Sequence, residues 1–161
     1  MDTAELRQTL NETIEHLVVH HGYTAYMRDY EVIVHVWNGP QSPSTYLRYL
    51  FRYCVEARCE TFLPADTWRI SLDDRLLDRE TADPDLGGYV WGTKFHEIYG
   101  AELRPESEAT RRWSKAVGIE FREVHVETSA HDLTLLFSDL EVSEVSVGYA
   151  PFIAGREPGA I

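Results

Sequence analysis

The chain has 161 residues, of which 43% are hydrophobic and 12% aromatic, enough for one folded core. Its formal net charge of −12 repels phosphate backbones and anionic lipid, so we expect neither nucleic acid nor a membrane surface as a partner. The polar N-terminus and the absence of a long apolar run predict a cytoplasmic protein, in which Cys54 and Cys59 stay reduced.

The first predicted element is an amphipathic helix over residues 3–20. Its apolar side chains recur every three or four residues, at Leu6, Leu10, Ile14, Leu17 and Val18. Asp2 and Glu5 have the spacing of a capping box, and Gly22 suits a left-handed residue after the helix.

Residues 28–37 and 46–62 are predicted strands, separated by a glycine- and proline-containing loop at 38–45. The second segment carries both a strand period and a helix period. We interpret it as a strand, because its alternation continues to Thr61 whereas the helical spacing fails after Val55. The two segments then form a long hairpin.

The middle of the chain predicts a short helix after Pro64, in which Trp68, Leu72 and Leu76 are four residues apart. An exposed connector follows at 78–88. Residues 89–95 are predicted to form a strand, with Gly92 at a bulge or at a close approach of two backbones.

The last third predicts one helix and three strands. The helix covers residues 107–117, beginning at Ser107 and ending at Gly118. The β-prone runs are residues 119–128, 133–138 and 140–147.

This order of elements, with mostly short connections between strands, predicts an α+β fold in a single domain over residues 1–152. We expect a mainly antiparallel sheet of about five to six strands, packed against the N-terminal helix and the helix at 107–117. Residues 153–161 are predicted to form a loosely held tail.

Clustered histidines suggest one kind of site, a metal centre. On the predicted first helix His16 and His20 lie four residues apart, so their rings share a face, and His21 adds a third imidazole. His125 and His131 flank a predicted turn and form a second candidate pair. The HExxH pattern is absent, and helix capping and solvation are the simpler explanation of the first cluster.

An aromatic and basic surface is the other candidate. Arg48 and Arg52 lie on the polar face of the predicted long strand, and Trp91 and Lys94 lie in a second aromatic stretch. Arg and Trp are enriched at the energetic centres of protein interfaces. A solvent-facing strand with cross-strand ion pairs is the simpler explanation of the alternation of Arg with Glu.

Seven runs of sequence, taken in order, resemble the YxiG-like family of small bacterial proteins over roughly residues 1–152. They are MRDYEVIVHV (27–36), LRYLFRYCVEA (47–57), SLDDRLLD (71–78), GYVWGTKF (88–95), RRWSKAVGI (111–119), VETSAH (126–131) and LLFSDL (135–140). The resemblance implies a bacterial cytoplasmic setting and an association with toxin–immunity gene neighbourhoods. It implies no catalytic or binding residue.

The sequence contains no nucleophile elbow and no phosphate-binding loop, so we predict neither a catalytic residue nor a cofactor. Our first hypothesis is a non-enzymatic, immunity-like protein-interaction module that binds a basic protein through Arg48, Arg52, Trp91 and Lys94. The alternatives are a metal-binding domain or small enzyme that uses the histidines, and a homo-oligomeric structural protein.

Overall fold

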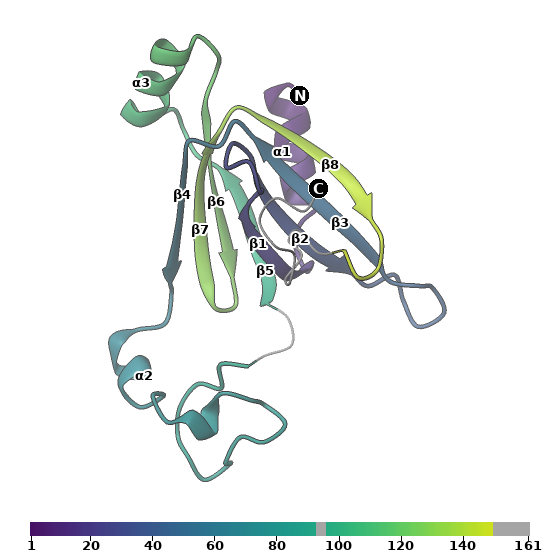
Figure 1. Cartoon of the computed structure of the whole chain (residues 1–161), viewed down its shortest axis with the longest axis vertical. Helices are drawn as coiled ribbons and strands as arrows, with labels where there is room; N and C mark the ends of the chain where they lie inside the picture. The colour runs from purple at the N-terminus through teal and green to yellow at the C-terminus, as the bar shows by residue number, and fades with distance from the viewer. Residues whose placement is uncertain (93–95, 150–161) are drawn as a thin grey trace, which may run out of the picture.

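The computed structural model describes residues 1–92 and 96–149. In this part of the chain, eight antiparallel strands form one sheet in the order β4-β7-β6-β5-β1-β2-β3-β8 (Figure 1). The elements in chain order are α1 (Thr3–Asn11), β1 (Leu17–Tyr23), β2 (Tyr30–Val36), β3 (Thr45–Arg52), β4 (Glu56–Thr61), α2 (Ala65–Arg69), the 3-10 turn η1 (Asp74–Leu76), β5 (His96–Leu103), α3 (Glu108–Val117), β6 (Arg122–Thr128), β7 (His131–Phe137) and β8 (Asp139–Val145). None of the described helices is long and apolar enough to cross a membrane.

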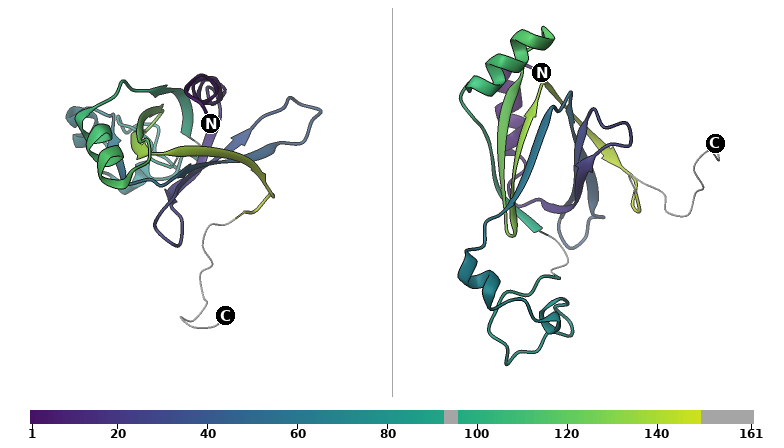
Figure 2. Two further views of the ribbon diagram at one scale, coloured as in Figure 1. Left: turned by 90° about the horizontal axis from the view of Figure 1, so that it is seen from above. Right: turned by 60° about the vertical axis from the view of Figure 1, so that its left-hand side comes forward.

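Two continuous stretches of chain pair along their whole length and give the sheet its shape. β3 pairs with β8, and β4 pairs with β7. In the chain, β4 directly follows β3, and β8 directly follows β7. Across the junction, the N–H of Val55 donates to the carbonyl of Leu136 at 2.9 Å, and the N–H of Ser138 donates to that of Arg52 at 3.0 Å. β4 and β8 stand at the two ends of the strand order, and the β3–β4 and β7–β8 stretches connect one end to the other. The sheet is therefore rolled rather than flat (Figure 2).

The long β3–β4 strand bends at Tyr53, which has a positive φ of 54°. Three residues separate the last β3 pair from the first β4 pair, whereas only two separate the corresponding pairs of β7 and β8. An extra residue on one strand bends it and increases its twist. The bend lets β3 pair with the β2 half of the sheet while β4 pairs with the β6 half.

The carboxylate of Asp29, which is 1% exposed, holds this bend. It accepts hydrogen bonds from the backbone N–H of Tyr53 at 2.9 Å, from the hydroxyl of Tyr26 at 3.0 Å and from two nitrogens of Arg28 at 3.0 Å. The N–H of Cys54 also donates to the carbonyl of Arg28 at 2.9 Å. Because a tyrosine in the left-handed region is strained, these bonds are what stabilises it there.

The core lies inside the roll. Phe51 of β3 and Phe137 of β7 meet edge to face, with ring centroids 5.0 Å apart. Helix α1 contributes Leu6 and Leu10, each 1% exposed. Cys54 contributes from the bend. The remaining buried members come from the inner faces of the strands, at Val18, Tyr30, Val32, Val34, Tyr49, Ile98, Ala101, Leu103, Val124, Val126, Leu133, Leu135 and Leu140.

The predicted helix over residues 3–20 is wrong beyond Asn11. The hydroxyl of Thr13 donates to the carbonyl of Leu10, and Glu15 has a positive φ of 67°, so the chain leaves the helix before it reaches β1. The continued stripe of apolar residues belongs to a strand that is rich in β-branched valine.

The α+β class, the helix at 107–117 and the antiparallel pairing of 28–37 with the first half of 46–62 are confirmed. The sheet has eight strands, not five to six, because 46–62 divides at its bend and two strands were missed. β1 begins within the predicted helix over 3–20, and β5 lies in a segment for which no strand is predicted. Residues 89–92 of the predicted strand at 89–95 form no strand, and the rest of it lies outside the described residues. The predicted tail at 153–161 lies outside the described residues.

We expect Asp29→Asn to lower the free energy of unfolding by about 2–4 kcal/mol at neutral pH, because it removes a buried charge that receives four hydrogen bonds. Burial raises the pKa of Asp29, but the bonds from Arg28, Tyr53 and Tyr26 outweigh it and hold the pKa below its usual value. Wild-type stability should therefore fall as acidification protonates this group, and the variant should lose less. Denaturant unfolding at several pH values measures both effects, and equal losses in the exposed control Asp85→Asn would contradict the assignment.

Candidate functional site

Residues 62–92 form a separate lobe beyond the end of the roll that lies opposite α3 (Figure 1). The lobe has a small interior of its own, in which Ser71 is fully buried and Leu76 is 1% exposed. Trp68 packs against Trp91 with ring centroids 4.5 Å apart, and the Trp91 indole N–H donates to the carbonyl of Ser71 at 2.6 Å. The lobe is therefore an ordered substructure although it contains little regular secondary structure.

Gly92 makes this packing possible. A Cβ atom at Gly92 would lie 2.0 Å from the carbonyl oxygen of Leu77, so only glycine allows the two backbones to approach. The N–H of Trp91 donates to the carbonyl of Leu76 at 2.9 Å in the same region. The close approach predicted for Gly92 is confirmed.

The outer surface of the lobe combines apolar and acidic side chains. Five large apolar residues are exposed, namely Phe62, Trp68, Ile70, Leu72 and Leu77. Leu72 has the highest exposed fraction of the five, at 70%. Residues 62–92 contain seven acids and three bases, a net charge of −4. Exposed apolar side chains that form a contiguous patch mark interaction sites in soluble proteins.

The structure does not bring the predicted surface residues together. Arg48 and Arg52 lie on β3, where Arg48 is 4.0 Å from the carboxylate of Glu31 and Arg52 is ion-paired with Glu141. Trp91 lies in the lobe, near the opposite end of the molecule from Arg52. Lys94 lies outside the described residues.

A groove opens at the end of the roll that carries α3, between this helix and the bend at Tyr53. This bend groove has a volume of about 400 Å³ and is lined by Tyr23, Met27, Arg28, Tyr53, Cys54, Val55, Trp113, Val117, Ile119 and Phe121. Met27 is 68% exposed and Val117 is 51% exposed. The guanidinium of Arg28 lies over the Tyr53 ring at 4.8 Å while it binds Asp29, so its charge is already matched.

Helix α3 forms one wall of this groove. Its first turn is fixed by a capping box between Ser107 and Thr110, and its last turn is tied by the Phe121 N–H, which donates to the Ser114 hydroxyl at 2.8 Å. Trp113 packs against Phe121 with centroids 6.1 Å apart. The helix therefore presents Trp113 and Val117 toward the groove.

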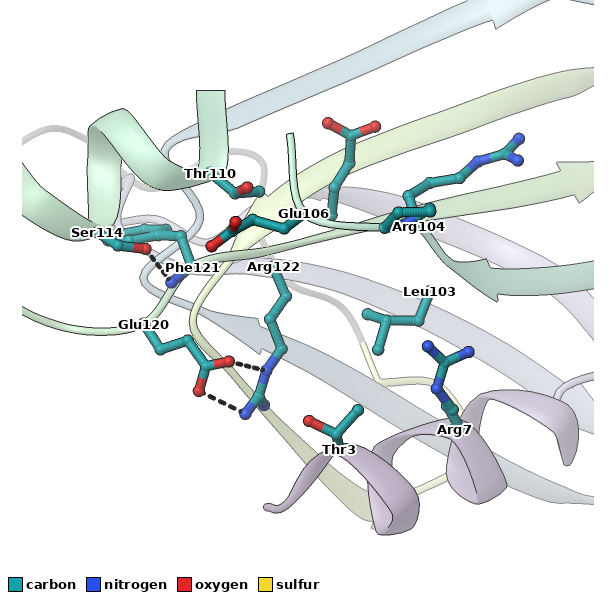
Figure 3. A pocket seen from close by; sticks show the side chains of 12 residues that line it. Thr3, Arg7, Leu103, Arg104, Glu106, Thr110, Ser114, Glu120, Phe121 and Arg122 are labelled. Atoms are coloured by element: carbon teal, nitrogen blue, oxygen red, sulfur yellow. Dashed lines mark hydrogen bonds and ion pairs between the residues drawn. The ribbon is translucent and has the colours of Figure 1, made fainter. Parts of the chain in front are cut away.

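A second, charged hollow of about 210 Å³ lies between α3 and α1 (Figure 3). Arg7, Arg104 and Arg122 line it together with Glu106, Glu120 and Glu123. Arg122 binds Glu120 at 2.8 Å, and Arg104 binds Glu102 at 3.0 Å. Because carboxylates match most of the cationic charge, the hollow is not an evident anion site.

Three imidazoles line a small hollow inside the roll, away from the end that carries α3. His21 of β1, His96 of β5 and His131 of β7 line a space of about 90 Å³. The Nδ1 atom of His21 lies 2.7 Å from the Tyr30 hydroxyl, a hydrogen bond that fixes the ring. Burial, followed by the neighbouring histidines, lowers the pKa of His21 and of His96.

His16 and His20 do not share a helix, so the helical spacing on which the predicted metal site rests is absent. His16 precedes β1, and His20 and His21 are neighbours on that strand, opposite Ile33 and Val32 of β2. Their side chains therefore point to opposite faces of the sheet. His125 and His131 lie on β6 and β7, where Thr134 and Thr61 are their pairing partners. Across residues 1–92 and 96–149, no three His, Cys, Asp or Glu side chains are arranged to hold a metal ion.

Sequence reasoning missed the lobe as a surface because it treated Trp68, Leu72 and Leu76 as one helical stripe. Only Leu76 is buried, whereas Leu72 points outward from the turn before η1. Asp73 and Asp74, which directly follow Leu72, were the available signal, since a leucine beside two aspartates is unusual for a buried face. The bend groove had no sequence signal, because its walls come from three distant segments.

Two comparisons with known proteins bear on this chain. A family model described as YxiG-like protein matches residues 2–155. A search of curated proteins finds no match.

We expect Gly92→Ala to disrupt the lobe while leaving the roll folded, because the added methyl group would collide with the backbone of Leu77. The environment of the Trp68–Trp91 pair should change, which near-ultraviolet circular dichroism detects. Proteolytic cleavage within residues 62–92 should become faster. Gly87→Ala is the matched control, since a Cβ at Gly87 meets no atom within 4 Å. Equal behaviour of the two variants would contradict this role of Gly92.

The histidine hollow predicts a further loss of stability on mild acidification. An unfolded histidine takes up its proton near pH 6.5, whereas the lowered pKa of folded His21 and His96 delays that uptake to lower pH. The free energy of unfolding should therefore fall as the pH drops below about 6.5. His21→Gln should make this dependence shallower between about pH 7 and 5, as measured by urea denaturation. A variant curve parallel to the wild-type curve would refute the prediction.

Proposed function

The chain belongs to the YxiG-like family, and we propose that it is a non-enzymatic protein-interaction module whose lobe docks a cationic protein. The observation that carries this proposal is the exposed apolar surface of the lobe within a strongly acidic segment. Apolar anchors supply affinity at an interface, and complementary charge supplies orientation and a fast encounter.

The apolar side chains of the lobe are suited to be anchors because the backbone beneath them is fixed. The indole N–H of Trp68 donates to the Thr61 hydroxyl at 2.9 Å, and its ring rests on Trp91. The hydroxyl of Ser71, next to Leu72, accepts the N–H of Tyr89 at 2.8 Å. An anchor that is already ordered loses less conformational entropy on binding.

The acidic groups of the lobe favour a basic partner. Asp73 and Asp83 both bind Arg75, at 2.8 Å and 3.3 Å, which neutralises part of their charge. Within the described residues, Asp74 and Glu80 have no ion pair and stay available to a partner. The net charge of −12 adds a long-range attraction for cations.

Trp91, one of the four residues predicted for the interaction, belongs to this surface as the support of Trp68. Arg48 and Arg52 are ion-paired on another face and are not part of the proposal. The finer role that we propose is immunity-like, in which the lobe covers a basic toxin inside the cytoplasm. The two free thiols, Cys54 and Cys59, are compatible with that reducing compartment.

Leu72→Asp tests the proposed docking surface. A protein captured from the native host should be identified, purified and titrated against the wild-type chain and the variant. We expect a basic partner whose affinity falls at least about tenfold with Leu72→Asp, the loss typical of a removed anchor. Binding should also weaken as salt rises, since screening reduces attraction between opposite charges.

Val147→Asp is the matched control. Val147 is 79% exposed and follows β8, outside the lobe, so the same substitution there should leave the affinity unchanged. An acidic partner, or a partner equally indifferent to both variants, would rule out the lobe as the docking surface.

A further inference from the structure

We infer that a second copy of this chain adds its own β4 antiparallel to the free edge of β4, so that two sheets join into one. β4 lies at one end of the strand order and, among the described strands, pairs with β7 alone (Figure 1). Its residues 58–61 are exposed. This edge lies outside the lobe, so the inference goes beyond the proposed function and does not depend on it.

The backbone of β4 directs alternate N–H and C=O groups toward its free side. Just after β4, the N–H of Phe62 donates to the carbonyl of Ala130, the residue before β7, at 3.4 Å. In an antiparallel ladder only every second residue bonds to a given neighbouring strand. The N–H and C=O groups of Ala57, Cys59 and Thr61 therefore point away from β7. Groups in this position are what an added strand bonds to.

A row of three carboxylates ends at this edge. Glu60 of β4 lies opposite Asp132 of β7, which lies opposite Glu127 of β6. Directly opposite residues share a face of the sheet, and like charges in such positions destabilise it. Within the described residues, the only basic group at ion-pair distance from this row is His125, 3.8 Å from Asp132 and 3.9 Å from Glu127, and a neutral imidazole adds no positive charge. The row thus favours a cation on the strand that is added beside Glu60.

A second copy of β4 supplies that cation in one register. When the two strands pair about a twofold axis at Cys59, Arg58 of each copy lies opposite Glu60 of the other. The same register brings together the backbone groups that face the free side. In its own strand, the Nε atom of Arg58 lies 3.0 Å from Glu56, which leaves the Nη groups for the second carboxylate. Charges on an edge strand usually oppose pairing with another sheet, but here they permit it in this register.

Other pairings fit less well. A twofold axis at Arg58 would place two arginines opposite each other, and an axis at Glu60 would do the same for two acids. An axis at Ala57 would match Arg58 with Glu56, but it would use only the first half of β4, since the chain before that half bends at Tyr53. β8, at the other end of the strand order, carries three acids and no base, so pairing with itself brings no cation.

The test uses purified chain alone, with molar mass followed by light scattering over about a hundredfold range of concentration, up to about 1 mM. We expect the mass of the wild-type chain to rise from 18.5 kDa toward twice that value and no further, because a twofold contact closes. Arg58→Glu and Glu60→Arg each place like charges opposite each other, so each should weaken the dimer at least about tenfold. Arg79→Glu, at an exposed arginine of the lobe, is the matched control and should dimerise like the wild type.

An equal mixture of the two β4 variants gives the decisive result. One strand then carries acids at positions 58 and 60 and the other carries bases, so the mixture should form a heterodimer although neither variant pairs with itself. The double variant R58E/E60R exchanges the two charges within one strand and should again form a homodimer.

The thiol of Cys59 reports the register. Opposite residues that exchange both backbone hydrogen bonds have Cα atoms about 5.5 Å apart, a distance that a disulfide spans. Diamide, which takes up the two thiol hydrogens, should therefore link two exposed Cys59 side chains in the wild-type dimer, whereas buried Cys54 stays reduced. Arg58→Glu retains the same thiol but should not become linked, and Cys59→Ser should dimerise without a link.

A wild-type chain that stays at 18.5 kDa throughout, or a mixture that fails to pair, would overturn the inference. Growth beyond a dimer, or a dimer that diamide does not link, would overturn it as well. Because neither the lobe nor a partner protein takes part, such failures leave the proposed function standing. Conversely, Leu72→Asp should leave the dimer unchanged, so loss of partner binding in that variant bears on the lobe alone.

Discussion

The carboxylate of Asp29 is the constraint on which the architecture depends. By accepting the N–H of Tyr53, it stabilises a backbone conformation that tyrosine otherwise avoids. That single bend separates β3 from β4 and lets one strand serve both halves of the sheet. Without it the alternating segment would continue straight, and the halves would be joined only through β1 and β5, which share two residue pairs. The rolled core between Phe51 and Phe137 follows from this geometry.

The fold was predictable where local pattern and tertiary context agree. The alternation of 28–37 and the capping signals around α3 report local preferences that the structure retains. The sequence failed at Leu17 and Val18, where apolar spacing fits a helix but β2 supplies a strand partner, with Leu17 opposite His35. It failed again at Tyr53, because a bend that a distant aspartate stabilises leaves no trace in a local period. The candidate surfaces were harder still. The lobe is one continuous segment, but its fold decides which of its apolar side chains are exposed, and the groove is assembled from three distant segments.

The middle of the molecule and its two ends differ in where their apolar side chains lie. The roll buries the aliphatic core and orders the chain, whereas the lobe and the bend groove expose aromatic and aliphatic side chains. Exposed groups of this kind cost solubility, and the high net charge offsets that cost. Arg28 links the two roles, because the same guanidinium that binds Asp29 also covers the ring of Tyr53 at the groove.

The lobe joins β4 to β5 and contributes no strand to the sheet. Its packing, including the close approach of Gly92 to Leu77, is therefore held by contacts within residues 62–92 and not by the hydrogen-bond ladder of the sheet. A change to an outward side chain of the lobe can thus alter its surface while the register of the roll stays the same.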